Sequence, residues 1–441
     1  MDVMIKATQF ILSLSLLIVL HELGHFLPAK YFKIKVEKFY LFFDYKFSLF
    51  KKKIGDTVYG IGWIPLGGYV KIAGMIDESM DTEQMKQEPK PWEFRSKPAW
   101  QRLIVMLGGV TVNFVLGILI YQMILFVWGE DYVTPEGVKN GFHVSQTFEE
   151  LGFQNGDKII KIDGQTPTDV VSINKQLFLR SLQNITVIHP NGAEETISVP
   201  EDIGTTMWAK NDLEPFVPLA VGVIDSVVPG KPAALAGIKK GDLITAVNDQ
   251  ETPYWNNFTK AVQESEEDLI DIDLMRNGEK IELQVNRLED KTIGVSASID
   301  IEKAIQIDHK DYSLGESITG GGSLAYWTLY DYIAQFKYVF TKKGAQSVGG
   351  FIAIGNIFPS TWSWQSFWSI TAFLSIMLGF MNLLPIPALD GGHVMFTLYE
   401  MVTGQKPSDK FLEYAQMTGF LLLIALLLLA NGNDIIKLFN G

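Results

Sequence analysis

The sequence contains no cysteine among its 441 residues, which excludes both a disulfide framework and a thiolate metal site. Histidine is also scarce, with six residues in the whole chain. Any zinc site must therefore use histidine, aspartate or glutamate. Basic residues are outnumbered by acidic ones, 37 to 50, and the formal net charge of −13 argues against nucleic acid as a partner.

The composition is neither that of a soluble protein nor that of a chain lying wholly in a membrane. Hydrophobic residues make up 47% of the sequence, and the mean hydropathy is +0.14. A chain of this length has room for two to four domains, so we expect a mixture of membrane spans and soluble modules. The first apolar segment lacks a small-x-small cleavage site, and we interpret it as a retained span rather than a signal peptide.

Four segments are predicted to cross a bilayer, and the fourth is short unless it begins near residue 414. Three glycines in the second permit close helix packing: Gly108, Gly109 and Gly117. The loop after the first span is rich in lysine, so the positive-inside rule makes it cytoplasmic and places both the N-terminus and the acidic region between the second and third spans outside. The four predicted segments are residues 7–29, 103–127, 367–384 and 417–430.

The end of the first span carries the motif H-E-L-G-H at residues 21–25. Ionisable groups are costly in an apolar helix and indicate a functional site. His21 and His25 lie one helical turn apart, where they can bind one zinc ion, and Glu22 can act as general base on metal-bound water. The motif predicts hydrolysis by zinc in or at a membrane.

A catalytic zinc site usually has three protein ligands, so one more is needed. The best candidate is Asp390, which follows a stretch broken by Pro385 and Pro387 at the end of the third span. A lone carboxylate near membrane depth is expected to have a partner, and a site made of two histidines and this aspartate would provide one.

The region between the second and third spans contains an internal repeat. The pattern Gly-apolar-x-x-Gly-Asp followed by alternating apolar residues occurs at 152–163 and again at 237–248. Each copy predicts a tight loop that leads into a half-buried strand. The pair resembles tandem PDZ domains of the kind found in bacterial proteases, although Gly-Asp turns also occur in other β domains.

Three further segments leave alternatives open. Aromatic and polar residues alternate at 45–50 and 59–72, which predicts two strands joined near 51–56, either as a sheet next to the membrane site or as a cytoplasmic hairpin. Aromatic residues at helical spacing in 324–340 predict an amphipathic helix, either on the outer membrane surface or packed on the β modules. The charged stretch 77–97 is expected to be a flexible loop, with Arg95, Lys97 and Arg102 as interfacial anchors.

Three features of the chain together resemble the site-2 protease family of intramembrane zinc metalloproteases. They are H-E-x-x-H in the first span, N-x-x-P-x-P-x-L-D-G-G at the end of the third, and paired PDZ-like modules between the second and third spans. The order of these features is similar to the branch of regulators of sigma E, and the resemblance covers nearly the whole chain. It implies zinc bound by His21, His25 and Asp390, with Glu22 as general base. It also implies that Asn382 helps to hold or polarise the scissile peptide.

The resemblance carries further expectations about the substrate. It implies single-span membrane proteins or signal-peptide remnants as substrates, cleaved at the bacterial cytoplasmic (inner) membrane, with PDZ domains on the outer side as a size filter. The segment P-L-G-G-Y-V at 65–70 resembles the family's re-entrant β segment. The residues expected to contact substrate are Gly67, Gly68, Tyr69, Val70, Pro385 and Pro387.

The expected fold is a polytopic α-helical membrane protein with four transmembrane helices, a membrane-associated β-sheet and two extracytoplasmic PDZ-like domains. The alternative function is a catalytically inactive, PDZ-bearing membrane scaffold. Three histidines in the region between the second and third spans have no ligand spacing and are assigned surface or packing roles: His143, His189 and His309. The expected order is a first transmembrane helix at 1–30, a cytoplasmic loop with the β segment at 31–100, a second helix at 101–128, PDZ-like domains at 129–208 and 209–305, amphipathic helices at 306–365, a third transmembrane helix at 366–388, a cytoplasmic connection at 389–413 and a fourth helix at 414–441.

Overall fold

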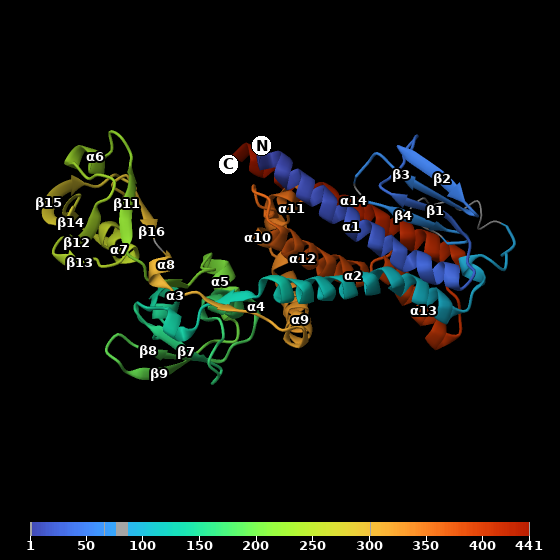
Figure 1. The fold of residues 1–441 in the computed structure, drawn as a ribbon, viewed down its shortest axis with the longest axis horizontal. Helices are drawn as coiled ribbons and strands as arrows, with labels where there is room; N and C mark the ends of the chain where they lie inside the picture. The colour runs from blue at the N-terminus through green and yellow to red at the C-terminus, as the bar shows by residue number, and fades with distance from the viewer. Residues whose placement is uncertain (1, 66, 76–86, 300, 441) are drawn as a thin grey trace. The chain divides into compact units, whose positions relative to one another are not determined.

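Figure 1 shows the fold in a computed structural model, which describes residues 2–65, 67–75, 87–299 and 301–440. The chain forms two compact units, each treated by itself below. The first unit combines Met1–Gly129 with Asp311–Gly441, and the second is Glu130–Lys310.

The first unit is built on long helices. Within the described ranges, four helices are long and apolar enough to cross a membrane, as the sequence predicts. The fourth is not short, because its apolar stretch continues in helical form over Lys410–Phe439. The helices of this unit are α1 (Asp2–Tyr31), α2 (Ala99–Trp128), α9 (Leu314–Val339), α10 (Lys342–Ser347), α11 (Phe351–Ile357), α12 (Trp364–Leu383), α13 (Asp390–Thr403) and α14 (Asp409–Asn440).

Helices α1 and α2 pack very closely at two facing glycines. A Cβ atom on Gly24 would lie 2.4 Å from the carbonyl oxygen of Gly108, and one on Gly108 would lie 2.0 Å from the carbonyl oxygen of Gly24. Nine residues further along α2, Gly117 packs against Ile376 of α12. The glycines in the second span therefore provide the close helix packing that was expected of them.

A four-stranded sheet follows α1 in the order β2-β3-β1-β4, and β4 lies at one edge. Strands β1 and β3 are parallel, whereas the other neighbouring pairs are antiparallel. Phe26 of α1 packs on Phe39 and Tyr59 with ring centroids 5.4 and 6.0 Å apart, so the sheet lies against the C-terminal half of α1 (Figure 1). The strands are β1 (Val36–Leu41), β2 (Phe50–Ile54), β3 (Thr57–Ile61) and β4 (Tyr69–Ile72).

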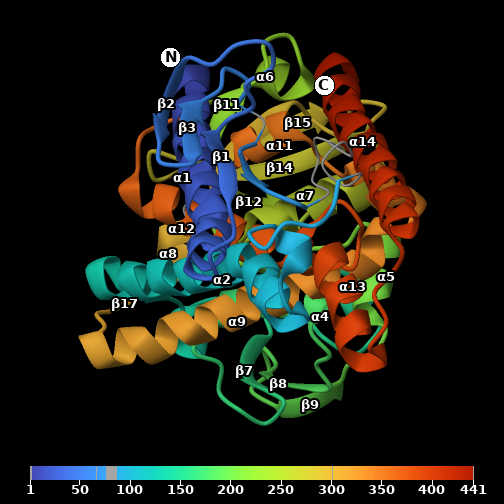
Figure 2. The same cartoon turned by 90° about the vertical axis from the view of Figure 1, so that its right-hand side faces the viewer.

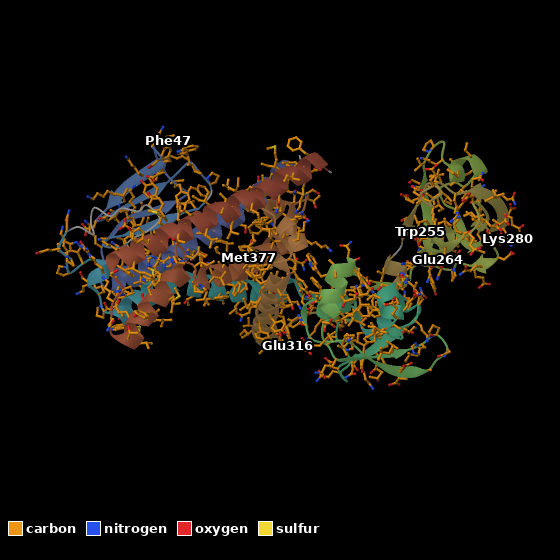
Figure 3. The ribbon with its side chains drawn as sticks, turned by 180° about the vertical axis from the view of Figure 1, so that it is seen from behind. Phe47, Trp255, Glu264, Lys280, Glu316 and Met377 are labelled. Carbon is orange, nitrogen blue, oxygen red and sulfur yellow. The ribbon has the colours of Figure 1, made fainter. Side chains whose placement is uncertain are left out.

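The strand prediction for this sheet was partly wrong. Residues 45–49 form no strand, and the lysines at 51–53 belong to β2 instead of a connection. The turn falls at Gly55, whose φ of +60° suits glycine. Outside the strands, Phe47 stacks on Trp63 with ring centroids 5.6 Å apart, and both side chains are exposed. Figure 3 shows Phe47 beside the sheet.

Two other predicted segments also need correction. Residues 76–86 of the expected flexible loop lie outside the described residues, but Phe94–Ser96 forms a short 3-10 helix with Phe94 buried. Arg102 is not an interfacial anchor, because its side chain is 9% exposed and forms an ion pair with Glu400 of α13. Burial favours such a pair over a free charge.

Helix α9 begins ten residues before the predicted start, because Ser313 and Glu316 form a capping box. It packs on α2, where Gly321 faces Gln122, and Figure 2 shows the two helices side by side. Near its C-terminal end, Tyr332 packs on Phe380 of α12 with ring centroids 5.8 Å apart. Neither alternative for this segment anticipated packing against the long helices of its own unit.

The second unit contains two β modules in tandem. The first has the sheet β7-β8-β9 and the pair β10-β6, and the second has the sheet β15-β14-β12-β11-β16 with β13 paired to β12. Each module has its own buried hydrophobic cluster. The elements are β5 (Glu130–Tyr132), β6 (Phe142–Val144), α3 (Gln146–Glu149), β7 (Lys158–Ile162), α4 (Ile173–Leu179), β8 (Asn184–Ile188), β9 (Glu194–Ser198), α5 (Ile203–Lys210), β10 (Phe216–Pro218), β11 (Gly222–Val227), α6 (Pro232–Ala236), β12 (Leu243–Val247), β13 (Gln250–Glu251), α7 (Trp255–Glu264), β14 (Leu269–Arg276), β15 (Glu279–Asn286), β16 (Val295–Ile299), α8 (Ile301–Ala304) and β17 (Asp308–Lys310).

The sequence repeat is also a structural repeat. Asp157 accepts a hydrogen bond from the backbone N–H three residues before it at 2.8 Å, and Asp242 does the same at 2.8 Å. The preceding glycines have φ of +97° and +92°, and a strand follows each aspartate directly. The prediction of a tight Gly-Asp loop leading into a strand is confirmed in both copies.

The two buried aspartates have different cationic partners. In the first module, His189 lies 2.7 Å from Asp157, and this hydrogen bond together with one to Glu195 raises the pKa of the imidazole. Burial raises the pKa of the Asp157 carboxyl as well. In the second module, burial alone would raise the pKa of Asp242, but hydrogen bonds from Arg276 outweigh it and hold that pKa below its usual value.

Candidate metal centre

The two histidines of the H-E-x-x-H motif lie on one face of α1. His21 and His25 are 9% and 6% exposed, and their Nε2 atoms are 3.3 Å apart. A continuous helix brings the two rings together because positions i and i+4 are stacked one turn apart. The two imidazoles therefore direct nitrogen atoms at the same point.

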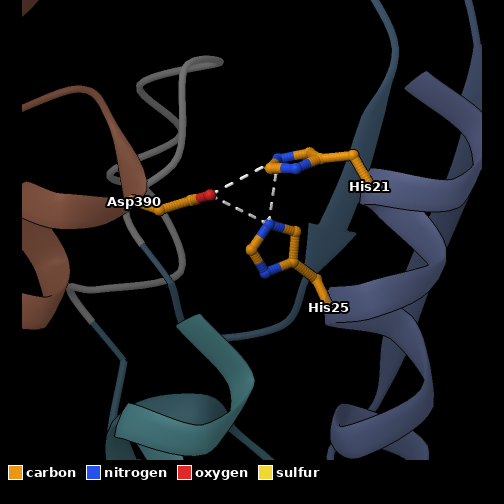
Figure 4. A group of neighbouring side chains, drawn as sticks. All are labelled: His21, His25 and Asp390. Atoms are coloured by element: carbon orange, nitrogen blue, oxygen red, sulfur yellow. Dashed lines mark hydrogen bonds and ion pairs between the residues drawn. The ribbon is translucent and has the colours of Figure 1, made fainter. Parts of the chain in front are cut away.

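Asp390 reaches this point from the other end of the sequence. It is the first residue of α13, after the proline-containing stretch that follows α12. Its Oδ2 atom lies 3.4 Å from Nε2 of His21 and 3.2 Å from Nε2 of His25 (Figure 4). Among the residues that the structure describes, this is the one group of three or more histidine, aspartate or glutamate side chains that could hold a metal ion.

These three atoms have the chemistry of a metal site. Nδ1 of His25 donates a hydrogen bond to the carbonyl oxygen of Val105 at 2.8 Å, so Nε2 of that ring keeps its lone pair. Oδ2 of Asp390 is buried without a hydrogen-bond partner. Ligands about 2.0–2.1 Å from a tetrahedral zinc ion lie about 3.3 Å from one another, and the observed spacings of 3.2–3.4 Å match that value.

Two asparagines approach His21 from different helices. Nδ2 of Asn382, on α12, lies 3.3 Å from Nε2, and Nδ2 of Asn113, on α2, lies 3.0 Å from Nδ1. Asn382 is expected near the site from the resemblance, whereas Asn113 has no predicted role there. The sequence signal that points to it is a polar amide within the second apolar span, four residues after Gly109.

Glu22 lies between the histidines and the sheet. The backbone of Val70 in β4 forms a hydrogen bond with its carboxylate. Gly68 permits this approach, because a Cβ atom there would lie 2.5 Å from Ile18 and 2.7 Å from the carbonyl oxygen of Tyr40. The edge of the sheet therefore faces the metal-binding side chains.

Helices and sheet together line an open cavity of about 510 Å³. It is lined by His21, Glu22, His25, Gly68, Tyr69, Val70, Asn382 and Asp390, among others. Three residues predicted to contact substrate, Gly67, Pro385 and Pro387, are not part of this lining. Gly67 instead faces the ring of Phe43, and Pro387 packs against Gly419 of α14.

The three histidines with predicted surface or packing roles each have a polar partner. His143 lies 2.6 Å from Asn155, His189 pairs with Asp157, and His309 lies 2.6 Å from Asp131. None of the three belongs to a metal-binding group in the described part of the chain.

A zinc-dependent peptidase needs a metal-binding triad with a glutamate beside it, and this chain has both among helices long enough to cross a membrane. The site thus defines a class, the membrane metallopeptidases.

Comparison with known proteins gives the family. The model of peptidase family M50 matches residues 9–426, and the chain belongs to this family, the site-2 proteases. It is a zinc metalloprotease of the membrane.

Relatives match over nearly their full length. The chain is 28% identical to the regulator of sigma E protease of Haemophilus influenzae, over 98% of each chain. It is 26% identical to protease RseP of Yersinia pestis, over 99% of this chain and 100% of that one. It is also 26% identical to the regulator of sigma-E protease RseP of Escherichia coli, over 98% of each.

Proposed function

We propose that this protein is an intramembrane endopeptidase that cuts peptide bonds within the transmembrane segments of single-span substrates. The observation that carries the proposal is the position of Glu22, which lies beside three converging ligand atoms and faces a cavity bounded by the edge strand β4. The motif occurs on a helix long enough to cross a membrane, so the bond that is cut would also lie at membrane depth.

In this proposal His21, His25 and Asp390 hold the zinc ion. Bound there, zinc polarises the peptide carbonyl and lowers the pKa of water towards neutral. Glu22 accepts a proton from the attacking water and later delivers it to the leaving amine. Asn382 donates a hydrogen bond from its amide to the oxyanion that develops on the carbonyl.

A helical substrate must unwind before this chemistry, because its carbonyl groups are engaged in hydrogen bonds. We propose that the unwound segment adds to β4 as a further strand, which replaces the lost backbone hydrogen bonds. The edge position of β4 and the presence of Tyr69 and Val70 in the cavity lining support this. Tyr69→Pro should impair cleavage of a helical substrate, and unimpaired cleavage would mean that strand addition does not occur there.

The names of the relatives refer to regulation of sigma E. We carry over to this chain a role in regulated intramembrane proteolysis at the bacterial inner membrane, with anti-sigma factors and signal-peptide remnants as candidate substrates. The lysine-rich loop after α1 would be cytoplasmic and the tandem β modules extracytoplasmic.

We further propose that the tandem modules are PDZ domains that filter substrates by admitting only those already trimmed on the outer side. Their insertion in the chain between α2 and α9 supports this role. Deleting residues 131–305 should permit cleavage of untrimmed substrates. Unchanged selectivity after the deletion would exclude the filter.

The decisive test of the enzyme is Glu22→Gln. It keeps the volume of the side chain and leaves His21, His25 and Asp390 untouched, so zinc should remain bound while cleavage of a single-span substrate is lost. An inactive scaffold predicts no change in function instead. The measurement is zinc content of the purified protein together with product fragments in membranes from cells that carry the variant.

A further inference from the structure

The segment that leads to Asp390 has few partners for the N–H groups of its backbone. Between residues 384 and 389, two positions are proline and lack an N–H group. Of the four remaining amide groups, Leu384, Ile386 and Leu389 donate to carbonyl oxygens within two or three residues. The fourth, Ala388, donates to Oε1 of Gln416 on α14 at 3.1 Å.

Ala388 needs this support because its backbone is strained. Its φ is +79°, in the left-handed region that an L-residue with a Cβ atom occupies at a cost. Such a conformation persists only where the surroundings hold it. Ala388 is 8% exposed and lies two residues before Asp390, so a change in its backbone would move the carboxylate directly.

Helix α14 is placed to hold this segment. Much of the helix is exposed, but Gln416 is 5% exposed. One turn later, Gly419 is so close to the segment that a Cβ atom would lie 1.6 Å from the carbonyl oxygen of Pro387. The amide of Gln416 and the backbone of Gly419 thus engage two consecutive residues, Pro387 and Ala388.

We propose that Gln416 is a positioning residue for the metal centre. Its side-chain carbonyl fixes the left-handed turn at Ala388 and so holds the carboxylate of Asp390 opposite the two histidines. The inference rests on the proposed function in one respect, namely that Asp390 is a zinc ligand. It adds a requirement that the fourth long helix contributes to zinc binding without touching the metal.

The test is zinc affinity of the full-length protein in detergent, measured by competition with a chromogenic chelator after metal removal. Gln416→Met keeps the side-chain length but removes the acceptor, and it should weaken zinc binding by about 10-fold to 100-fold, the range for loss of an outer-shell partner. Gln416→Glu keeps an acceptor oxygen and should stay close to the unchanged protein. The matched control is Thr418→Val, because the Thr418 hydroxyl donates its hydrogen bond to the carbonyl oxygen of Tyr414 in its own helix.

Three results would overturn the proposal. One is unchanged zinc affinity in Gln416→Met, the second is an equal loss in Thr418→Val, and the third is a raised KM for substrate with normal zinc affinity, which would make Gln416 a substrate contact in the cavity. Ala388→Gly gives an independent check, because glycine adopts positive φ without strain and should restore part of the zinc affinity in the Gln416→Met background.

A further variant separates this proposal from the proposed function. If Asp390→Asn leaves zinc affinity unchanged, the assigned ligand set fails. If Asp390→Asn abolishes binding while Gln416→Met does not weaken it, only the positioning role of Gln416 fails. Limited trypsin digestion of each variant reports whether the fold is intact, and Gln416→Glu still tests the role of the acceptor oxygen if the methionine variant does not fold.

Discussion

Gly109→Ala should damage the metal centre although glycine has no side chain to bind metal. A Cβ atom at this position of α2 would lie 2.4 Å from Nε2 of His25 and 2.6 Å from Cε1 of His21. Both rings are buried, and Gly24 and Gly108 already bring the backbones of α1 and α2 into close contact beside them. The added methyl group must therefore displace the imidazoles themselves.

The size of the displacement follows from the contact distances. Ordinary van der Waals contact with a Cβ atom begins at 3.4 Å, so the ring of His25 must move by about 1 Å. A misplacement of about 1 Å in a reacting geometry costs about 100-fold in rate. We expect Gly109→Ala to lower kcat/KM by about that factor and to weaken zinc binding as well.

The assay is cleavage of a single-span substrate together with zinc affinity by chelator competition. The control is Gly117→Ala, on the same helix as Gly109, because its new methyl group meets the flexible end of Ile376 of α12, which can move aside. It should leave both measurements near those of the unchanged protein. If Gly109→Ala retains full activity and zinc affinity, the close approach of α2 to the histidines does not constrain the site.

Two further predictions follow from buried pairs. Asn113→Leu should weaken zinc binding by about 10-fold to 100-fold, measured by chelator competition. The reason is that turning the Asn113 amide lets its unpartnered Oδ1 accept the Nδ1 proton of His21, which fixes that ring for metal binding. An unchanged affinity would refute this. The raised pKa of His189 implies stability that is fully present below about pH 6.5, its unfolded value, and is lost as the pH rises through the folded value. Hydrogen exchange in the full-length protein, corrected for the intrinsic exchange rate, should therefore show the first module losing protection as the pH rises above that unfolded value while the second does not. His189→Arg should remove the difference, and equal behaviour of the two modules would contradict the prediction.

The parts of the site that the sequence predicted are local or chemically costly. His21 and His25 were predictable because helical spacing alone brings positions i and i+4 together. Asp390 was predictable although it is distant in sequence, because a carboxylate beside an apolar span needs a partner. Asn113 and Gln416 carry polar amides, which also occur in apolar spans that bind no metal. Their roles depend on which helices face each other, and no local sequence pattern records that.

The β modules show the same limit. The Gly-Asp loops at Asp157 and Asp242 were predicted because positive φ at glycine and an aspartate that bonds its own backbone are local features. Their partners, His189 and Arg276, come from the ends of neighbouring strands and depend on strand pairing. The misplaced strand at 45–50 had a similar cause, since Phe47 stacks on Trp63, a residue distant in sequence, instead of taking part in a strand.

Helix α2 helps to hold the geometry of the metal centre, although it contributes no metal ligand. Val105, Gly109 and Asn113 are spaced four residues apart and so face the histidines from one side of the helix. The first acts through its backbone carbonyl, the second through the absence of a side chain and the third through its amide. Their tolerance to substitution should differ accordingly, since the carbonyl survives a change of side chain at Val105, whereas only glycine fits the second position and only a hydrogen-bonding side chain serves at the third.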